Sequence, residues 1–99
     1  MASRKISWDT QALQQFNAAI KYIARDSLQN AEKVRQSILK KIDRLPTHPT
    51  LYNPDKYKKN NDGNFRAFEL HRYRISYHAS EVEIRILRVR HTSMEPKEY

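Results

Sequence analysis

The stretch from Asn64 to His91 constrains the fold more than any other part of this chain. It reads as three consecutive β-strands joined by tight turns, because apolar and polar residues alternate along it. A sheet that only had to fold would carry Thr, Ser or Glu at many positions where this stretch has arginine: Arg66, Arg72, Arg74, Arg85, Arg88 and Arg90. The sheet is therefore a candidate anion-binding surface, and a nucleic-acid backbone is the best candidate anion.

A short strand and two helices are predicted ahead of this stretch. We expect residues 4–8 to form the strand and Asp9 to be the N-cap of the first helix. That helix should end near Arg25. Ser27 or Asn30 caps a second helix, which Pro46 prevents from continuing. The apolar stripes of the two helices are Leu13, Phe16, Ile20 and Ile23, then Ala31, Val34, Ile38, Ile42 and Leu45. Only a residue or two separates the helices, so they should pack as an antiparallel hairpin.

The predicted fold is a single α+β domain over residues 1–99, with the order β-α-α-β-β-β. One antiparallel sheet is expected, with the helical hairpin covering one of its faces. The connection over residues 46–63 is long and polar, and such loops are often functional. It carries Lys56, Lys58 and Lys59 with tyrosines between them, which suits either a solvated loop or a flexible RNA-contacting loop.

Strand pairing predicts which side chains share a face. A two-residue turn at His71–Arg72 places Glu69 opposite Arg74, with the polar face open to solvent and the other face apolar. A Ser80–Glu81 turn would leave two arginines of the last strand facing the core, which a bulge near Ile86 would repair. That bulge would also flip His91, so the facing of the last strand stays open.

Composition excludes several classes of protein. Lys and Arg number 19 against 11 Asp and Glu, a formal charge of +8, which favours an acidic partner. No cysteine is present, and one glycine cannot supply a phosphate-binding loop. The histidines lack paired metal spacing, so neither a metal nor another cofactor is expected. No apolar run could span a bilayer and no signal peptide opens the chain, so we expect a cytoplasmic protein without membrane contact.

Four residues are candidates for acid–base and charge-stabilising chemistry. Glu69 and Arg74 form either a cross-strand ion pair or a proton acceptor beside a phosphate-binding guanidinium. His91 closes the last strand, where it is either structural or able to reach a ligand. Tyr99 either caps the core or contributes a phenol to catalysis or base stacking.

The chain resembles the RelE/ParE superfamily of toxins from type II toxin–antitoxin modules over nearly its whole length. The segments that carry the resemblance are the opening strand ending in Trp8, SLQNAEKV, YKKNNDGNFRAFEL and, most specifically, RYRISY followed by ILRVRH. The superfamily implies two activities: RelE-like members cut mRNA in the ribosomal A site, whereas ParE-like members poison DNA gyrase without cleavage chemistry. Both imply a cognate antitoxin whose C-terminal segment wraps the toxin.

Several residues of this chain can be compared with the functional residues of RelE-like members. In the resemblance, Arg74 matches a RelE-like arginine, while His91 and Tyr99 fall near a histidine base and a C-terminal tyrosine. Glu69 is plausible but unmatched. The RelE-type lysines would be replaced by the loop lysines, with RNA contacts from Lys56, Lys58, Lys59, Arg66, Arg72, Arg85, Arg88 and Arg90.

We therefore expect a toxin acting as a metal-free, ribosome-dependent mRNA endonuclease. A gyrase inhibitor is the alternative, favoured by the long helical stripes, and a non-toxic nucleic-acid-binding domain is the third reading.

Overall fold

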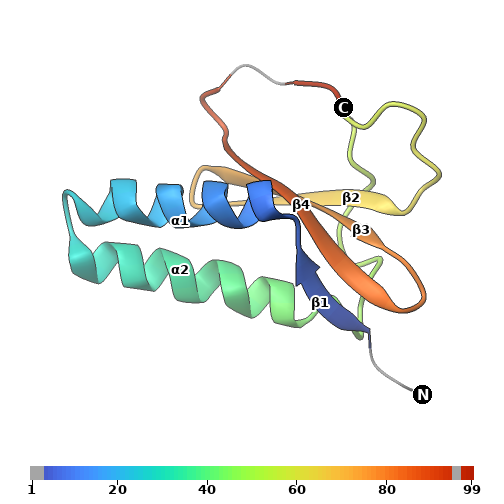
Figure 1. Ribbon diagram of the computed structural model, residues 1–99, viewed down its shortest axis with the longest axis horizontal. Coiled ribbons are helices and arrows are strands. Elements are labelled where there is room, and N and C mark those ends of the chain that lie inside the picture. The colour runs from blue at the N-terminus through green and yellow to red at the C-terminus, as the bar shows by residue number, and fades with distance from the viewer. Residues whose placement is uncertain (1–3, 95–96) are drawn as a thin grey trace.

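The computed structural model describes residues 4–94 and 97–99. Two helices lie side by side and cover one face of a four-stranded sheet (Figure 1). The elements follow the order β1 (Lys5–Trp8), α1 (Thr10–Ala24), α2 (Leu28–Asp43), β2 (Phe65–Leu70), β3 (Tyr73–Ala79) and β4 (Glu83–His91). The predicted α+β fold and its β-α-α-β-β-β order are confirmed.

The sheet is mixed, which corrects the expectation of an antiparallel one. Its strand order is β1-β4-β3-β2, and β2, β3 and β4 pair antiparallel as consecutive hairpins. The first strand pairs parallel with β4, joining Ile6 to Ile84 and Trp8 to Ile86. The helical hairpin and two further strands lie between β1 and β4 in the chain, so no tight turn imposes antiparallel pairing on them.

A side-chain hydrogen bond caps the start of α2, but none caps the start of α1. Ser27 is the N-cap of α2, as predicted, and its hydroxyl accepts a hydrogen bond from the Asn30 N–H at 3.0 Å. Asp9 occupies the N-cap position of α1, but its carboxylate makes no capping bond and instead forms an ion pair with Arg85 of β4. Residues 25–27 separate the helices, slightly more than the expected one or two.

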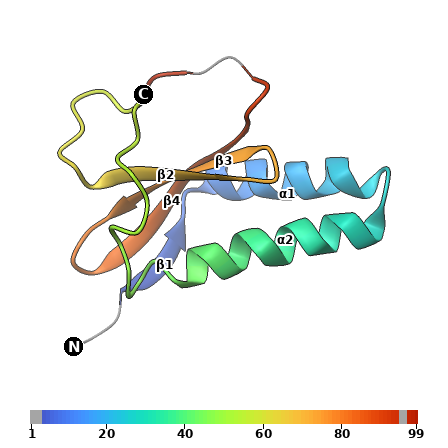
Figure 2. The ribbon, with the colours of Figure 1, turned by 180° about the vertical axis from the view of Figure 1, so that it is seen from behind.

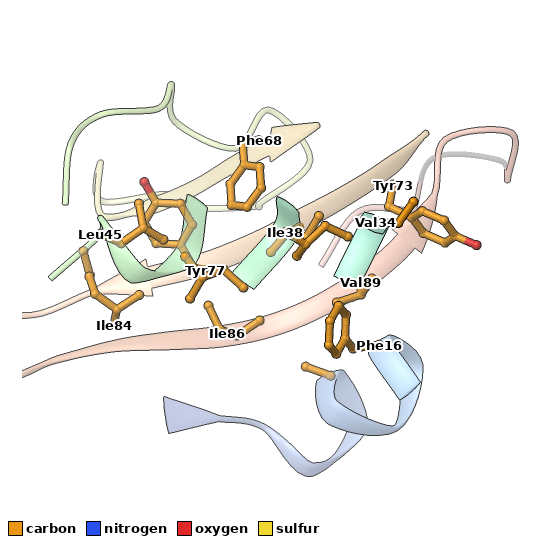
Figure 3. Close-up of a cluster of buried hydrophobic side chains, with 14 residues drawn as sticks. Phe16, Val34, Ile38, Leu45, Phe68, Tyr73, Tyr77, Ile84, Ile86 and Val89 are labelled. Carbon is orange, nitrogen blue, oxygen red and sulfur yellow. The ribbon is translucent and has the colours of Figure 1, made fainter. Parts of the chain in front are cut away.

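The core lies between α2, α1 and the covered face of the sheet. Figure 3 shows Val34 and Ile38 of α2 facing the sheet, and Phe16 of α1 beside Val89. Ile75, Tyr77, Ile84 and Ile86 are completely buried. Full burial of one such aliphatic side chain contributes about 1.5–3 kcal/mol. Leu13 is 44% exposed, so this member of the predicted α1 stripe lies outside the core.

The β2–β3 hairpin has the predicted register. Leu70 pairs with Tyr73 and Glu69 with Arg74, which leaves His71 and Arg72 as the two-residue turn. Both turn residues have positive φ, 52° and 70°, as a type I′ turn requires. The backbone twist of that turn matches the twist of the strands on either side, and this fixes which β2 and β3 side chains share a face.

A bulge in β4 resolves the facing that the sequence left open. Tyr77 pairs with Ile86 and Ser76 with Arg88, so Leu87 is the extra residue, next to the predicted position. The preceding turn is shifted by one residue from the expected Ser80–Glu81 pair: Ala79 pairs with Ile84 and the Ser80 N–H donates to the Glu83 carbonyl at 2.9 Å, which leaves Glu81 and Val82 at the tip.

Beyond the bulge the facing of β4 is inverted. Val89 pairs with Ile75 and is buried in the core, and His91 pairs with Tyr73 on this same face. Arg90 pairs with Arg74, so it belongs with Arg88 to the opposite, polar face. The bulge therefore gathers arginines from two strands on one side of the sheet.

None of the helices in the described part of the chain has the length and apolar character needed to cross a membrane.

Candidate functional site: a covered polar face of the sheet

The polar face of the sheet is covered, which corrects the expectation that it lies open to solvent. Figure 1 and Figure 2 place the C-terminal segment beside the connection between α2 and β2. We call residues 53–59 and 97–99 the polar cover. Its two parts are joined by backbone bonds, from the Lys59 N–H to the Tyr99 carbonyl at 2.7 Å and from the Tyr99 N–H to the Tyr57 carbonyl at 3.0 Å. Beneath the cover Ser76 is fully buried.

Asp55 is the centre of this site, although no pattern in the sequence predicted it. Its side chain has no exposed surface. The carboxylate accepts bonds from the Arg74 guanidinium at 2.8 Å, the Tyr99 hydroxyl at 2.6 Å and the Tyr57 N–H at 3.1 Å. An acidic residue among lysines, immediately after Pro54, was the one available signal, and local pattern does not say that it is buried.

The two ionic partners stabilise each other's charge. Burial alone would raise the pKa of Asp55, but bonds from Arg74, Tyr99 and Tyr57 outweigh it and lower that pKa below its ordinary value of 3.8. For Arg74, burial acts to lower the pKa, and the carboxylates of Asp55 and Glu69 reverse this and raise it. Both groups are therefore held in the charged state at neutral pH.

Arg74 is engaged by carboxylates at both of its terminal nitrogens. One donates to Asp55, and the other donates to Glu69 at 3.0 Å. The Tyr57 ring centroid lies 4.8 Å from the guanidinium carbon, and the arginine side chain is only 15% exposed. Glu69 is more than half exposed, so the cross-strand pair lies at the edge of the covered region.

Tyr99 is held by Asp55 and by an arginine. Burial, reinforced by the Asp55 carboxylate, raises the pKa of its phenol, which makes it a weaker acid. The Arg88 guanidinium lies 4.0 Å from the centroid of the Tyr99 ring and donates to the Lys97 carbonyl at 2.6 Å. The C-terminal residues are thus fastened to β4 as well as to the loop.

His91 lies apart from the buried network, at the end of β4. Its ring contacts Tyr73 edge-on at 5.0 Å, and its Nδ1 accepts a bond from the Ser93 N–H at 3.0 Å. We therefore assign the proton of the neutral ring to Nε2. A small pocket of about 50 Å³ links this end of the strand to Glu69, Arg74 and Arg90.

The predicted RNA-binding residues do not form one free surface. Arg66 donates to the Tyr52 carbonyl at 2.7 Å, and Arg85 pairs with Asp9. Lys59 lies 3.8 Å from the Glu98 carboxylate. These three basic side chains are therefore held by partners within the molecule.

The remaining members of that set come from three parts of the chain. Lys56 lies 5.3 Å from the Tyr57 ring centroid, and Lys58 lies 4.7 Å from that of Phe65. Arg72 is exposed in the β2–β3 turn, and Arg90 is half-buried on β4. Over residues 4–94 and 97–99, no group of three or more His, Cys, Asp or Glu side chains is placed to hold a metal ion.

The elements described above define a small α+β protein, and comparisons with known proteins identify its family. Residues 6–96 match the family described as the ParE toxin of the type II toxin–antitoxin system parDE, and the chain belongs to it. As a type II toxin of the RelE/ParE superfamily it has a cognate antitoxin as its partner.

Two solved structures share the fold. The chromosomal ParDE toxin–antitoxin system of P. aeruginosa aligns with a TM-score of 0.69 and 17% identity, covering 92% of this chain and 98% of that one. The YoeB dimer from Staphylococcus aureus aligns with a TM-score of 0.61 and 18% identity, covering 91% and 98%. No curated protein matches the chain.

Proposed function

We propose that this toxin acts by binding its target, as a ParE-like inhibitor of DNA gyrase, and not by cleaving RNA. This reverses the preference expressed by the sequence. One observation carries the proposal: both terminal nitrogens of Arg74 are bound to carboxylates of the same chain, and the Tyr99 hydroxyl is bound to one of those carboxylates.

Cleavage by the RNA 2′-hydroxyl needs groups that the site does not offer in this arrangement. A cation must face the phosphate as charge develops, and an acid must protonate the leaving oxygen. Arg74 already faces two carboxylates, and the pKa of Tyr99 is raised by burial. The nitrogen of His91 left for a ligand carries the proton in the neutral ring, which suits a donor better than a base.

Membership of the ParE toxin family supports the same proposal. In the resemblance drawn from the sequence, ParE-like members poison gyrase without chemistry of their own. The assigned target is then DNA gyrase in the cytoplasm, and the candidate catalytic residues become parts of the folded framework.

A ribosome-dependent mRNA endonuclease is the second candidate. The pocket that His91 shares with Glu69, Arg74 and Arg90 is the observation that favours it, since base, acid and cations would have to meet at one point.

Induced expression with two readouts separates the candidates. We expect stabilised gyrase–DNA breaks in a cleavage assay, with mRNA ends unchanged by primer-extension mapping. His91→Gln should leave growth arrest intact, and so should His48→Gln, its matched control on an exposed loop position. New mRNA ends that vanish when translation is blocked, together with loss of arrest in His91→Gln alone, would establish the endonuclease.

A further inference from the structure

The two edge strands of the sheet are protected differently. The outer side of β2 is bonded to the loop before it, where the Ala67 N–H donates to the Asn53 carbonyl at 3.3 Å. At the other end of the sheet, β1 pairs with β4 on one side, and no second strand in the described part of the chain pairs with it (Figure 2). An open edge presents unpaired N–H and C=O groups that another chain can pair with.

The backbone groups of Ile6 and Trp8 form this open edge. The N–H groups of Lys5 and Asp9 donate to backbone carbonyls on the β4 side of the strand, at 3.1 and 2.9 Å. Backbone groups alternate in direction along a strand, so Ser7 also bonds toward β4 and its two neighbours point outward. Within the residues that the structure describes, no helix or loop bonds these outward groups.

Side chains hold β1 in place at both ends. At its start, the Arg4 guanidinium donates to the Ser80 carbonyl at 2.6 Å and to the Pro46 carbonyl at 3.2 Å. At its end, the Asp9 carboxylate is paired with Arg85 of β4. An edge that is already ordered loses little conformational freedom when a partner strand adds to it.

One antiparallel register makes this edge complementary to itself. With Ser7 opposite Ser7 of a second copy, Ile6 stands opposite Trp8 and Lys5 opposite Asp9. Ile6 and Trp8 share the helix-covered face and are only partly buried, so each apolar side chain meets another. On the other face a lysine meets a carboxylate. The outward backbone groups of Ile6 and Trp8 then meet as hydrogen-bonded pairs.

Other registers lack this complementarity. A shift by one residue places Ile6 opposite Ser7, which joins an apolar face to a polar one. A shift by two places Arg4 opposite Trp8 and removes the pairing of Lys5 with Asp9. Two chains that each carry a formal charge of +8 repel each other, so local pairs of opposite charge matter for their association.

We propose that a second copy of this chain adds to the β1 edge in this register, joining two sheets into one across a two-fold axis at Ser7. The edge is short, so the dimer should be weak, with a dissociation constant of about 10–100 µM. The inference concerns the assembly of the protein and does not depend on whether gyrase is its target.

An introduced cysteine tests the register, because the chain has none of its own. Ser7 would form a non-hydrogen-bonded pair with its copy, and Cα atoms in such pairs lie within reach of a disulfide. Ser7→Cys should therefore form a disulfide-linked dimer about tenfold faster than Lys5→Cys in a non-reducing electrophoresis time course. Lys5 is the matched control, because it is more exposed on the same face but stands opposite Asp9.

Sedimentation equilibrium tests the ion pair without a cysteine. At about 100 µM the unaltered protein should show an average mass above the 11.8 kDa of one chain. Lys5→Glu places like charges opposite each other and should raise the dissociation constant about tenfold. Lys33→Glu makes the same change of charge at an exposed position of α2 and should not weaken the dimer.

The possible outcomes separate the second copy from other occupants of the edge. A protein that stays monomeric at about 500 µM would overturn the proposal, since that is well above the expected dissociation constant. So would Ser7→Cys that crosslinks no faster than Lys5→Cys, or equal weakening by Lys5→Glu and Lys33→Glu. If Lys5→Glu weakens antitoxin binding to a chain that is monomeric alone, the edge belongs to the antitoxin and the proposal is wrong. Circular dichroism checks that every variant is folded.

Discussion

The two faces of the one sheet are covered by different physical means. The helix-covered face is closed by aliphatic and aromatic side chains such as Ile38, Ile75 and Ile86, which are excluded from water. The opposite face is closed by the polar cover, through a buried carboxylate and the groups that donate to it. Burial of apolar surface is non-directional, whereas the bonds of Asp55 require particular atoms at particular places.

The two faces of the sheet should therefore tolerate different kinds of amino-acid substitution. The apolar face should accept exchanges that conserve volume, because what matters there is the space filled. The polar face should fail when a single group is lost, because a buried charge without its partner is costly. Four measurements test that contrast, and the largest effect is expected at the apolar face.

Ile86→Ala should lower the free energy of unfolding by about 2–5 kcal/mol, since Ile86 is completely buried and its loss leaves a cavity. Urea denaturation measures the change. Ile86→Val should cost about 0.5–1.5 kcal/mol. Leu28→Ala, at a leucine 78% exposed, is the control and should stay within about 0.5 kcal/mol. Equal costs for Ile86→Ala and Leu28→Ala would contradict the assigned core.

Asp55→Ala should lower the free energy of unfolding by about 3 kcal/mol, the low end for a broken buried ion pair, because Arg74 keeps its bond to Glu69. The same denaturation measurement applies. Glu81→Ala, at an exposed acid in the turn after β3, is the matched control, expected within about 0.5 kcal/mol. A cost below about 1 kcal/mol at Asp55 would mean that the cover contributes little to stability.

Acid should weaken the polar face selectively. The pKa of Asp55 is lowered in the folded state, so its stabilisation is complete above its unfolded value of 3.8 and is lost as pH falls through the lower, folded value. Unfolding free energies compared between pH 6 and pH 2 should therefore fall less steeply for Asp55→Asn than for the unaltered protein. Parallel pH profiles for the two would disprove a lowered pKa at this carboxyl.

The smallest effect compares two buried hydroxyls. Tyr99→Phe should cost about 2 kcal/mol, because its hydroxyl donates to a carboxylate. Tyr77→Phe should cost about 1 kcal/mol, because its hydroxyl donates to the neutral Pro49 carbonyl at 3.0 Å. Thermal unfolding of the two variants side by side measures the difference. The reverse order would show that the neutral bond at the apolar face is the stronger one.

Local pattern predicted much of the apolar face and little of the polar one. Alternation along residues 65–79 and the two-residue turn at His71–Arg72 were enough for the β2–β3 register, including the Glu69–Arg74 pair. A conflict in the alternation of the last strand indicated the bulge beside Ile86. The stripe of α2 likewise predicted Val34, Ile38 and Ile42 as core.

The parallel pairing of β1 and the role of Asp55 were missed for one reason. Trp8 and Ile86 lie far apart in the chain, and Asp55 meets Arg74 and Tyr99 across 19 and 44 residues. Period-2 and period-3.6 patterns report which residues share a face of one element. They carry no information on which loop returns to cover that face.

The sequence by itself determined the elements, their order and the facing of most side chains, because these depend on neighbours one to four residues apart. It also determined the resemblance to the toxin superfamily. Tertiary structure alone decided that Arg74 and Tyr99, proposed from sequence as reactive groups, are bound to one buried carboxylate. The physical reason is that a side chain's reactivity depends on its burial and its partners, and both are set when distant segments pack together.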